Sequence, residues 1–275
     1  MSDGGDAGRG GRRRRREGAG FDLDLERLVT VYACDIDGCL AAAGHANFDL
    51  AALGEMAVLN GRSDEDPAVP ALTIVTGRPH AYVDAISQLL RVDLPFSFEN
   101  GAGLATRRPY RAWFAPEVGE GRAELRAFVA VIEREPRMML QPGKVASLSV
   151  FPAVSGYDLE DLEHDVGNLL RAGGFSLLLD PSTDCMNVLV PGINKASGFD
   201  WLLKELEVAP EAVAGIGDSV GDLAWLRRCG VSIAPGNAVP QVWAAVDLKL
   251  PGQDVAAALA GYEALVAANR RLLGR

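Results

Sequence analysis

The feature that most restricts the fold of this chain is a repeated order of short apolar runs and amphipathic segments. Apolar, β-branched runs at 28–34, 71–75, 213–217 and 231–234 predict strands, and the segment 80–92 has apolar residues at helical spacing. Strands that alternate with helices pair in parallel, because each connection has to cross over the sheet. The order therefore predicts an α/β fold with a doubly wound parallel sheet and helices on both faces.

Between residues 104 and 187 the pattern changes. Runs at 146–151, 175–179 and 186–190 predict further strands, and 159–172 predicts one helix. The short turn between the last two strands favours an antiparallel sheet with helices on one side, so we expect an α+β module inserted into the core. The predicted organisation is a tail at 1–26, a first part of the core at 27–103, the insert at 104–187 and a second part of the core at 188–275.

The composition excludes several classes of protein. The chain has 27 basic and 37 acidic side chains, a net charge of −10, which disfavours binding to nucleic-acid phosphates. The arginine-rich segment 1–20 has no apolar run, so we expect a disordered tail there. No run approaches the ~20 apolar residues of a membrane span, and the four cysteines lack zinc-site spacing. We therefore expect a cytoplasmic protein without nucleic-acid or membrane partners, and its oligomeric state stays open.

Two aspartates follow the first predicted strand. Asp35 and Asp37 stand on either side of Ile36, and Gly38 comes next. The carboxyl ends of parallel strands form the ligand-binding edge of such a sheet, and two carboxylates buried there are costly unless a cation neutralises them. A hard divalent ion, Mg²⁺ by preference, meets this need. Taken alone, the pair is equally consistent with a strand-ending turn, in which aspartate and glycine are common.

The second predicted strand and a later helix carry further polar residues. Thr76 and Gly77 follow the 71–75 strand, where a hydroxyl and free backbone N–H groups can hold a phosphate. A simple helix cap at Thr76 is the alternative. Lys195 precedes an amphipathic helix, where the helix dipole disfavours a cation unless an anion compensates it. A solvated lysine is the simpler explanation when this position is taken alone.

The strand at 213–217 ends in the same way. Asp218 follows it, and Asp222 lies one helical turn further, so the two carboxylates share a face. Asp218 can complete a metal site with Asp35 and Asp37, and Asp222 can bind or orient that site. An N-cap at Asp218 and a surface carboxylate at Asp222 are the alternative. All these groups together at one sheet edge form the set that phosphoryl transfer requires.

In this order, the motifs resemble those of the haloacid dehalogenase-like superfamily of phosphatases. The residues that carry the resemblance are Asp35-Ile36-Asp37-Gly38, Thr76, Lys195, and Asp218 with Asp222. The insert resembles the type-two cap of that superfamily, and Glu99 to Ala102 resemble a segment of its Cof-type, sugar-phosphate phosphatase branch. The resemblance implies a Rossmann-like core with an inserted α+β cap domain. Gly221 departs from the pattern, because many type-two relatives have asparagine there.

The resemblance also implies an activity. The chain would be a Mg²⁺-dependent phosphatase acting on a small phosphorylated metabolite, a sugar phosphate or a phosphoglycolate-like acid. Asp35 would be the nucleophile that forms an aspartyl-phosphate, and Asp37 would be the acid and base. The implied metal site is Asp35, Asp37 (through its backbone carbonyl), Asp218 and Asp222, and the implied phosphate site is Thr76, Gly77 and Lys195.

Two other functions stay open from the sequence. One is a phosphomutase of the same architecture, which returns the phosphoryl group to its substrate instead of to water. The other is a non-catalytic phosphate-binding domain, against which Asp37 and the insert both argue. Within the insert, Ser182, Thr183 and Asn187 are candidate specificity residues, although turn chemistry after Pro181 explains them more simply.

Overall fold

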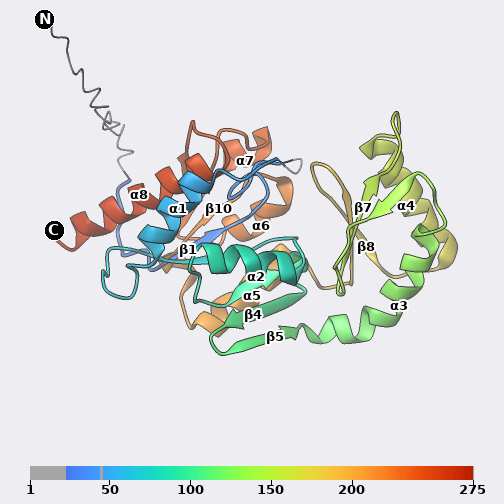
Figure 1. Ribbon diagram of the computed structural model, residues 1–275, viewed down its shortest axis with the longest axis horizontal. Helices are drawn as coiled ribbons and strands as arrows, with labels where there is room; N and C mark the ends of the chain where they lie inside the picture. The colour runs from blue at the N-terminus through green and yellow to red at the C-terminus, as the bar shows by residue number, and fades with distance from the viewer. Residues whose placement is uncertain (1–22, 44–45, 275) are drawn as a thin grey trace, which may run out of the picture.

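The computed structural model describes residues 23–43 and 46–274, and its core is a five-stranded parallel sheet (Figure 1). The strand order is β12-β11-β10-β1-β2, and every pairing in this sheet is parallel. The prediction of a doubly wound parallel sheet is confirmed. The strands are β1 (Val31–Cys34), β2 (Ala71–Ile74), β10 (Val213–Ile216), β11 (Val231–Ala234) and β12 (Leu248–Lys249).

Helices cover both faces of this sheet, and the inner strand β1 is therefore buried on both sides. Along β1, Tyr32 and Cys34 belong to one apolar cluster, and Val31 and Ala33 belong to another. Successive side chains of a strand point to opposite faces, so this alternation defines two cores. The first core is covered by α1 (Leu50–Asn60), α2 (His80–Leu89) and α8 (Asp254–Leu272), and the second by α5 (Lys195–Leu206), α6 (Leu223–Leu226) and α7 (Pro240–Ala245).

A small antiparallel sheet follows the first part of the core. It consists of β3 (Phe96–Phe98), β4 (Gly103–Arg107) and β5 (Tyr110–Phe114). A bridge between Val75 and Ser97 joins β3 to the end of β2, and β4 contacts α2 and α5. Residues 104–114, which the sequence analysis assigns to the insert, therefore pack against core helices, and the boundary at 104 stays a prediction.

The second lobe in Figure 1 is an antiparallel sheet with two long helices. Its strand order is β6-β7-β9-β8, and one apolar cluster joins the sheet to the helices. The expected antiparallel α+β insert is therefore present. Its elements are α3 (Pro116–Ile132), β6 (Met138–Leu140), β7 (Leu148–Pro152), α4 (Leu159–Gly173), β8 (Leu178–Pro181) and β9 (Met186–Leu189).

Three short 3₁₀ helices and one tight connection matter for the site. The 3₁₀ helices are η1 (Glu99–Gly101), η2 (Pro210–Ala212) and η3 (Val220–Asp222). Only five residues separate the end of β9 from Lys195, the first residue of α5. A reciprocal cap closes that connection, since Asn194 Oδ1 accepts from the Ser197 amide at 2.9 Å and the Asn194 amide donates to Ser197 Oγ at 3.0 Å.

Of the predicted tail at 1–26, the structure describes only residues 23–26. Residues 1–22 lie outside the described residues. Leu23 and Leu25 pack against the first apolar core, and the Leu23 carbonyl accepts a hydrogen bond from Arg271 at 2.7 Å. Within the described ranges, no helix combines the length and the apolar character needed to cross a membrane.

Candidate active site

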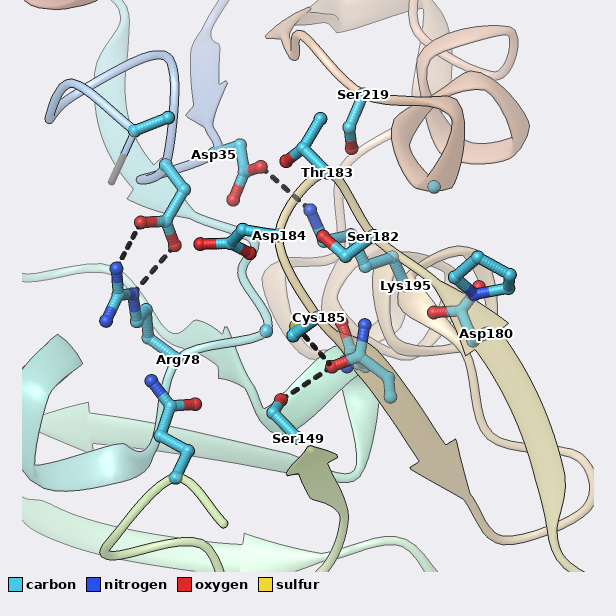
Figure 2. A pocket seen from close by; sticks show the side chains of 18 of the residues that line it. Asp35, Arg78, Ser149, Asp180, Ser182, Thr183, Asp184, Cys185, Lys195 and Ser219 are labelled. Carbon is cyan, nitrogen blue, oxygen red and sulfur yellow. Dashed lines mark hydrogen bonds and ion pairs between the residues drawn. The ribbon is translucent and has the colours of Figure 1, made fainter. Parts of the chain in front are cut away.

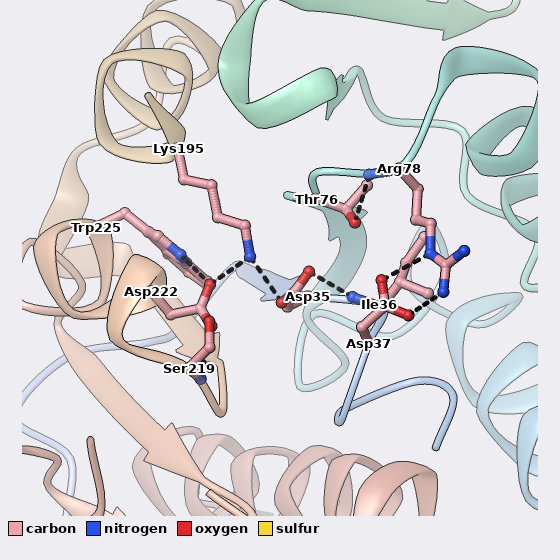
Figure 3. A network of polar contacts seen from close by, with 9 residues as sticks. All are labelled: Asp35, Ile36, Asp37, Thr76, Arg78, Lys195, Ser219, Asp222 and Trp225. Atoms are coloured by element: carbon pink, nitrogen blue, oxygen red, sulfur yellow. Dashed lines mark hydrogen bonds and ion pairs between the residues drawn. The ribbon is translucent and has the colours of Figure 1, made fainter. Parts of the chain in front are cut away.

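Strand order brings the predicted residues to one edge of the sheet. Because β1 lies between β2 and β10, the segments after these three strands are neighbours, and they carry Asp35, Thr76 and Asp218. Lys195 reaches the same edge from the start of α5 (Figure 3). Four segments that are far apart in the sequence thus meet at the carboxyl ends of parallel strands, where open α/β sheets bind ligands.

Lys195 is held between two buried carboxylates. Its Nζ atom donates to Asp35 Oδ2 at 2.8 Å and to Asp222 Oδ1 at 2.8 Å (Figure 3). Burial alone would lower the pKa of Lys195, but the two carboxylates outweigh it and raise that pKa well above its usual value. The ammonium therefore stays charged, and the expectation that an anion compensates this lysine is met by Asp222 and Asp35.

Asp222 is the most completely bonded carboxylate of the edge. Besides Lys195, Oδ1 accepts from Trp225 Nε1 at 2.9 Å, and Oδ2 accepts from the Ser219 amide at 3.0 Å and its hydroxyl at 2.8 Å. Burial would raise the pKa of Asp222, but Lys195 and these donors lower it overall. Asp222 is thus a fixed anion that orients Lys195, and the alternative of a surface carboxylate is wrong because this side chain is fully buried.

Asp218 lies against the turn that carries the aspartate pair. A Cβ atom at Gly38, where φ is +73°, would come within 2.2 Å of Asp218 Oδ2, so this approach and this conformation both require glycine. Burial and the neighbouring carboxylates of Asp222 and Asp35 raise the pKa of Asp218 to about 8. Burial, only partly offset by Lys195, raises the pKa of Asp35 to about 7. Negative charge at this edge is therefore under-compensated by the protein itself.

These carboxylates fit a divalent cation. Asp35, Asp218 and Asp222 each offer one oxygen, and the three oxygens lie within 4.8 Å of one another. Carboxylate oxygens at such spacing, with raised pKa values at two of the three residues, suit a hard ion such as Mg²⁺. The Asp37 carboxylate is not part of this group, and a contribution from its backbone carbonyl stays a prediction.

Asp37 instead forms an ion pair that the sequence analysis missed. Arg78 Nε donates to Asp37 Oδ2 at 2.7 Å, and Arg78 Nη2 donates to Asp37 Oδ1 (Figure 3). The guanidinium also lies 4.8 Å from the centre of the Tyr82 ring. Arg78 comes directly after Gly77 at the end of a strand, and this position in the sequence could have indicated that Arg78 belongs to the site. Acid–base chemistry at Asp37 requires the carboxylate to exchange this partner for the substrate.

The predicted phosphate-binding turn after β2 is compact. Thr76 is buried, and its Oγ1 atom accepts from the Arg78 amide at 3.2 Å. This bond lies within the turn and does not cap α2, whose N-cap is Pro79 without a side-chain bond, so the alternative of a helix cap at Thr76 is wrong. Gly77 lines the pocket, whereas Thr76 is not among the lining residues. A Cβ atom at Gly77 would lie 2.8 Å from Asn100 Oδ1, so Asn100 packs directly on this turn. Whether Thr76 contacts phosphate stays a prediction.

The insert forms the opposite wall of the same pocket. Ser182 and Thr183, on the turn between β8 and β9, face the pocket together with Asp35 and Lys195 (Figure 2). They line the pocket as well as forming a turn. The other lining residues of the insert include Gln141, Lys144, Ser149, Asp180, Asp184, Cys185 and Asn187.

Lys144 is the cation of that wall, and no spacing in the sequence indicated it. Its Nζ atom donates to Ser149 Oγ, which in turn donates to Asn187 Oδ1 at 2.7 Å. Among the described residues, no carboxylate forms an ion pair with it. Burial lowers the pKa of Lys144 to about 8, so the side chain is mostly charged at neutral pH. A cation without an ion-pair partner in the described part of the chain thus lies on the insert side of the pocket.

Comparison with known proteins gives matches of several kinds. A family model described as haloacid dehalogenase-like hydrolase matches residues 157–257. The 5-amino-6-(5-phospho-D-ribitylamino)uracil phosphatase of Bacillus subtilis is 32% identical over 85 residues, which are 30% of this chain and 34% of that protein. The phosphoglycolate phosphatase of Nitrosopumilus maritimus is 29% identical over 96 residues, 34% of this chain and 41% of that protein. These alignments thus span less than half of either relative.

Solved structures share the fold over most of the chain. A protein of Thermoplasma acidophilum superposes with a TM-score of 0.70 at 16% identity, covering 87% of this chain and 99% of its own. The sucrose-phosphatase of Synechocystis, solved with sucrose and phosphate, gives a TM-score of 0.63 at 14% identity, covering 87% and 98%. The family match over part of the chain, the similarity to named phosphatases and the shared fold all support the resemblance to the haloacid dehalogenase-like hydrolases.

Proposed function

We propose that this protein hydrolyses phosphate monoesters of small metabolites, with Asp35 as the nucleophile and Mg²⁺ as the cofactor. The observation that carries the proposal is the arrangement of Asp35 between Lys195 and the carboxylates of Asp218 and Asp222. The group offers a nucleophilic oxygen, a fixed cation and a metal-binding set at one sheet edge. Related proteins named as phosphatases, including one for phosphoglycolate, support the same chemistry.

The proposed reaction has two displacements at phosphorus. Asp37 first exchanges its ion pair with Arg78 for a proton. An oxygen of Asp35 then attacks the phosphorus atom, the bond to the leaving oxygen breaks, and Asp37 transfers its proton to that oxygen. In the second displacement Asp37 takes a proton from water, the water oxygen bonds to phosphorus, and the bond to Asp35 breaks. Inorganic phosphate leaves, and both aspartates return to their starting states.

The charges of the edge suit this sequence. Lys195 holds Asp35 at 2.8 Å, so the nucleophile is oriented before the substrate arrives, and Arg78 holds Asp37 until the substrate replaces it. The transferring phosphoryl group spreads negative charge over its oxygens, which Lys195 and the Gly77 backbone can stabilise. When bound by Asp35, Asp218 and Asp222, Mg²⁺ supplies further positive charge to neutralise those oxygens.

The leaving group would bind against the insert. Its wall combines the Lys144 ammonium with the hydroxyl of Ser149, the amide of Asn187 and the carboxylate of Asp180, all of which line the pocket. Such groups suit a polar leaving group, and a leaving group with its own anion could pair with Lys144. A sugar phosphate and a phosphorylated hydroxy acid are the two substrate classes that this wall favours.

Phosphate release from a panel of phosphorylated metabolites tests the proposal. We expect Mg²⁺-dependent release from the wild-type protein and at least about a thousandfold lower kcat for Asp35→Asn, since loss of a nucleophile has effects of this size or larger. Asp93→Asn is the control, because this exposed carboxylate does not line the pocket and should keep full activity. Isomerised substrate without free phosphate would indicate a phosphomutase, and equal activity of the two variants would contradict the proposal.

A further inference from the structure

The segment η1 holds an unusual backbone conformation beside the phosphate-binding turn. Glu99 has φ +49°, Asn100 has φ +57°, and Gly101 follows with φ +87°. Residues with a Cβ atom rarely adopt this left-handed region, and such strain concentrates at functional sites. Two bonds tie the segment to the turn after β2: the Asn100 amide donates to the Thr76 carbonyl at 3.0 Å, and the Glu99 amide donates to the Arg78 carbonyl at 3.0 Å.

The Asn100 side chain has a buried donor without a partner. The residue is 2% exposed and lines the pocket, and its Nδ2 atom has no hydrogen bond among the described residues. Other buried asparagines differ. Asn269 Nδ2 donates to the Val29 carbonyl at 2.7 Å and the Ala68 carbonyl at 3.1 Å, and Asn60 Nδ2 likewise donates to two carbonyls. Buried polar groups are nearly always paired. We therefore expect a bound molecule to provide the acceptor for the side-chain amide of Asn100.

The position of this amide identifies the acceptor. The Asn100 side chain packs on Gly77, with Oδ1 at 2.8 Å and Nδ2 at 3.3 Å from where a Cβ atom would be, in the pocket that Asp35 and Lys195 also line. The Lys195 ammonium and the Gly77 backbone, to which the proposed function assigns the phosphoryl oxygens, line the same pocket. We infer that Asn100 Nδ2 donates a hydrogen bond to a phosphoryl oxygen of the substrate. This inference rests on the proposed function, which does not itself assign a role to Asn100.

Glu99 holds Asn100 in place from the other side. Its Oε2 atom accepts from the backbone amides of Val145, Ala146 and Ser147 at 3.1, 2.7 and 2.9 Å. The same atom accepts from the Ser147 hydroxyl at 3.3 Å. The carboxylate is fully buried, so these bonds replace all of its hydration. Residues 145–147 lead into β7 of the insert. Glu99 is therefore a positioning residue that links this part of the insert to the Asn100 amide.

Binding of inorganic phosphate, measured in the presence of Mg²⁺ by calorimetry and as product inhibition, tests the inference. Asn100→Gly removes the side chain and suits the positive φ, so we expect a thermal midpoint close to that of the wild type. Loss of a charge-assisted hydrogen bond predicts a phosphate dissociation constant about 10- to 100-fold higher. Asn269→Ala is the matched control, for which we expect a lower thermal midpoint and unchanged phosphate affinity.

Each outcome separates the inference from the proposed function. Wild-type phosphate affinity in Asn100→Gly, or a loss of thermal stability as large as that of Asn269→Ala, would overturn the inference while leaving hydrolysis intact. Weaker phosphate binding in a protein that hydrolyses no ester would support the inference and remove the proposed function.

The role of Glu99 has its own test. We expect Glu99→Gln to weaken phosphate binding in the wild-type background and to add nothing in the Asn100→Gly background, because the two residues act as one unit. Ser147→Ala removes a single bond to Glu99 and provides a milder variant if Glu99→Gln does not fold. Additive losses in the double variants would overturn the positioning role.

Discussion

The two walls of the pocket are built in different ways. The core wall consists of charged groups that bond one another, as in the chain from Asp35 through Lys195 to Asp222. The insert wall consists of a partly exposed turn at 181–184 and a cation, Lys144, whose bond goes to a neutral hydroxyl. A wall of mutually bonded charges tolerates little change, whereas a wall of separate polar groups can vary. Under the proposed function, this difference assigns the reaction to the core and the selection of the leaving group to the insert.

The strongest way to break this comparison is Lys195→Met. The variant leaves the buried carboxylates of Asp35 and Asp222 without their cation, and removing one partner of a buried ion pair costs about 3–5 kcal/mol. We expect a fall in unfolding free energy of this order without Mg²⁺ and loss of activity on every substrate. Urea unfolding and phosphate release measure the two effects. Selective loss on some substrates only would contradict the assignment of this residue to the reaction.

Mg²⁺ and pH act on the same wall. The folded pKa values of Asp35 and Asp218, about 7 and about 8, lie above the ordinary value of 3.8, so their contribution to stability is full below pH 3.8 and lost as pH rises through 7 and 8. Mg²⁺ requires the ionised carboxylates. Saturating Mg²⁺ at about a hundredfold its dissociation constant should stabilise the protein by about 2.7 kcal/mol.

The measurement is the thermal midpoint with and without Mg²⁺ at pH 6 and pH 8. We expect the larger upward shift at pH 8, and we expect Asp218→Asn to reduce it. A shift that is larger at pH 6, or one that Asp218→Asn leaves unchanged, would show that the metal binds elsewhere.

Gly38→Ala tests how tightly the core wall is packed. A residue with a Cβ atom pays about 1–2 kcal/mol in the left-handed region, and the added methyl group would meet Asp218 at 2.2 Å. We expect lower stability and a weaker Mg²⁺-induced shift in the thermal midpoint, since Asp218 has to move. Gly54→Ala is the control, because a Cβ atom there meets nothing within 4 Å and should be tolerated.

Lys144→Met tests the comparison of the two walls from the insert side, and we expect the smallest effect from it. We expect nearly unchanged stability, an approximately tenfold lower kcat/KM for esters whose leaving group carries an anion, as for loss of one modest ionic interaction, and little change for p-nitrophenyl phosphate. In the wild type this preference should fall as pH rises through about 8, where the ammonium loses its proton. A uniform loss on all esters would place Lys144 with the reaction instead of with leaving-group selection.

Sequence reasoning located the core wall because strand ends are local features. Asp35, Thr76 and Asp218 each follow an apolar run directly, Asp37 stands two residues after Asp35, and a parallel sheet brings such strand ends together. Lys195 is recognisable in the sequence because it is a cation at the start of a helix, where the helix dipole disfavours positive charge unless an anion compensates it. The fold class and the insert are predictable because the spacing of apolar residues along the chain distinguishes strands from helices.

The missed residues depend on contacts between distant segments. Arg78 pairs with Asp37 across 41 positions, and Glu99 bonds amides 46 to 48 positions away. Asn100 lies in the segment that the resemblance identifies, but the absence of a partner for its Nδ2 atom in the part of the chain that the structure describes depends on the packing around it, which no pattern of letters records. The contacts of β4 with α2 and α5 are likewise not local, so the sequence does not indicate them.

The short return from the insert to Lys195 has a mechanical consequence. The reciprocal cap between Asn194 and Ser197 fixes the first turn of α5 and therefore the lysine itself. The preceding residues, 190–193, include Gly192 with φ +89° and lack such a cap. A change of backbone direction between the insert and α5 would therefore fall at Gly192, ahead of the cap, and would leave the ammonium beside Asp35 in its place.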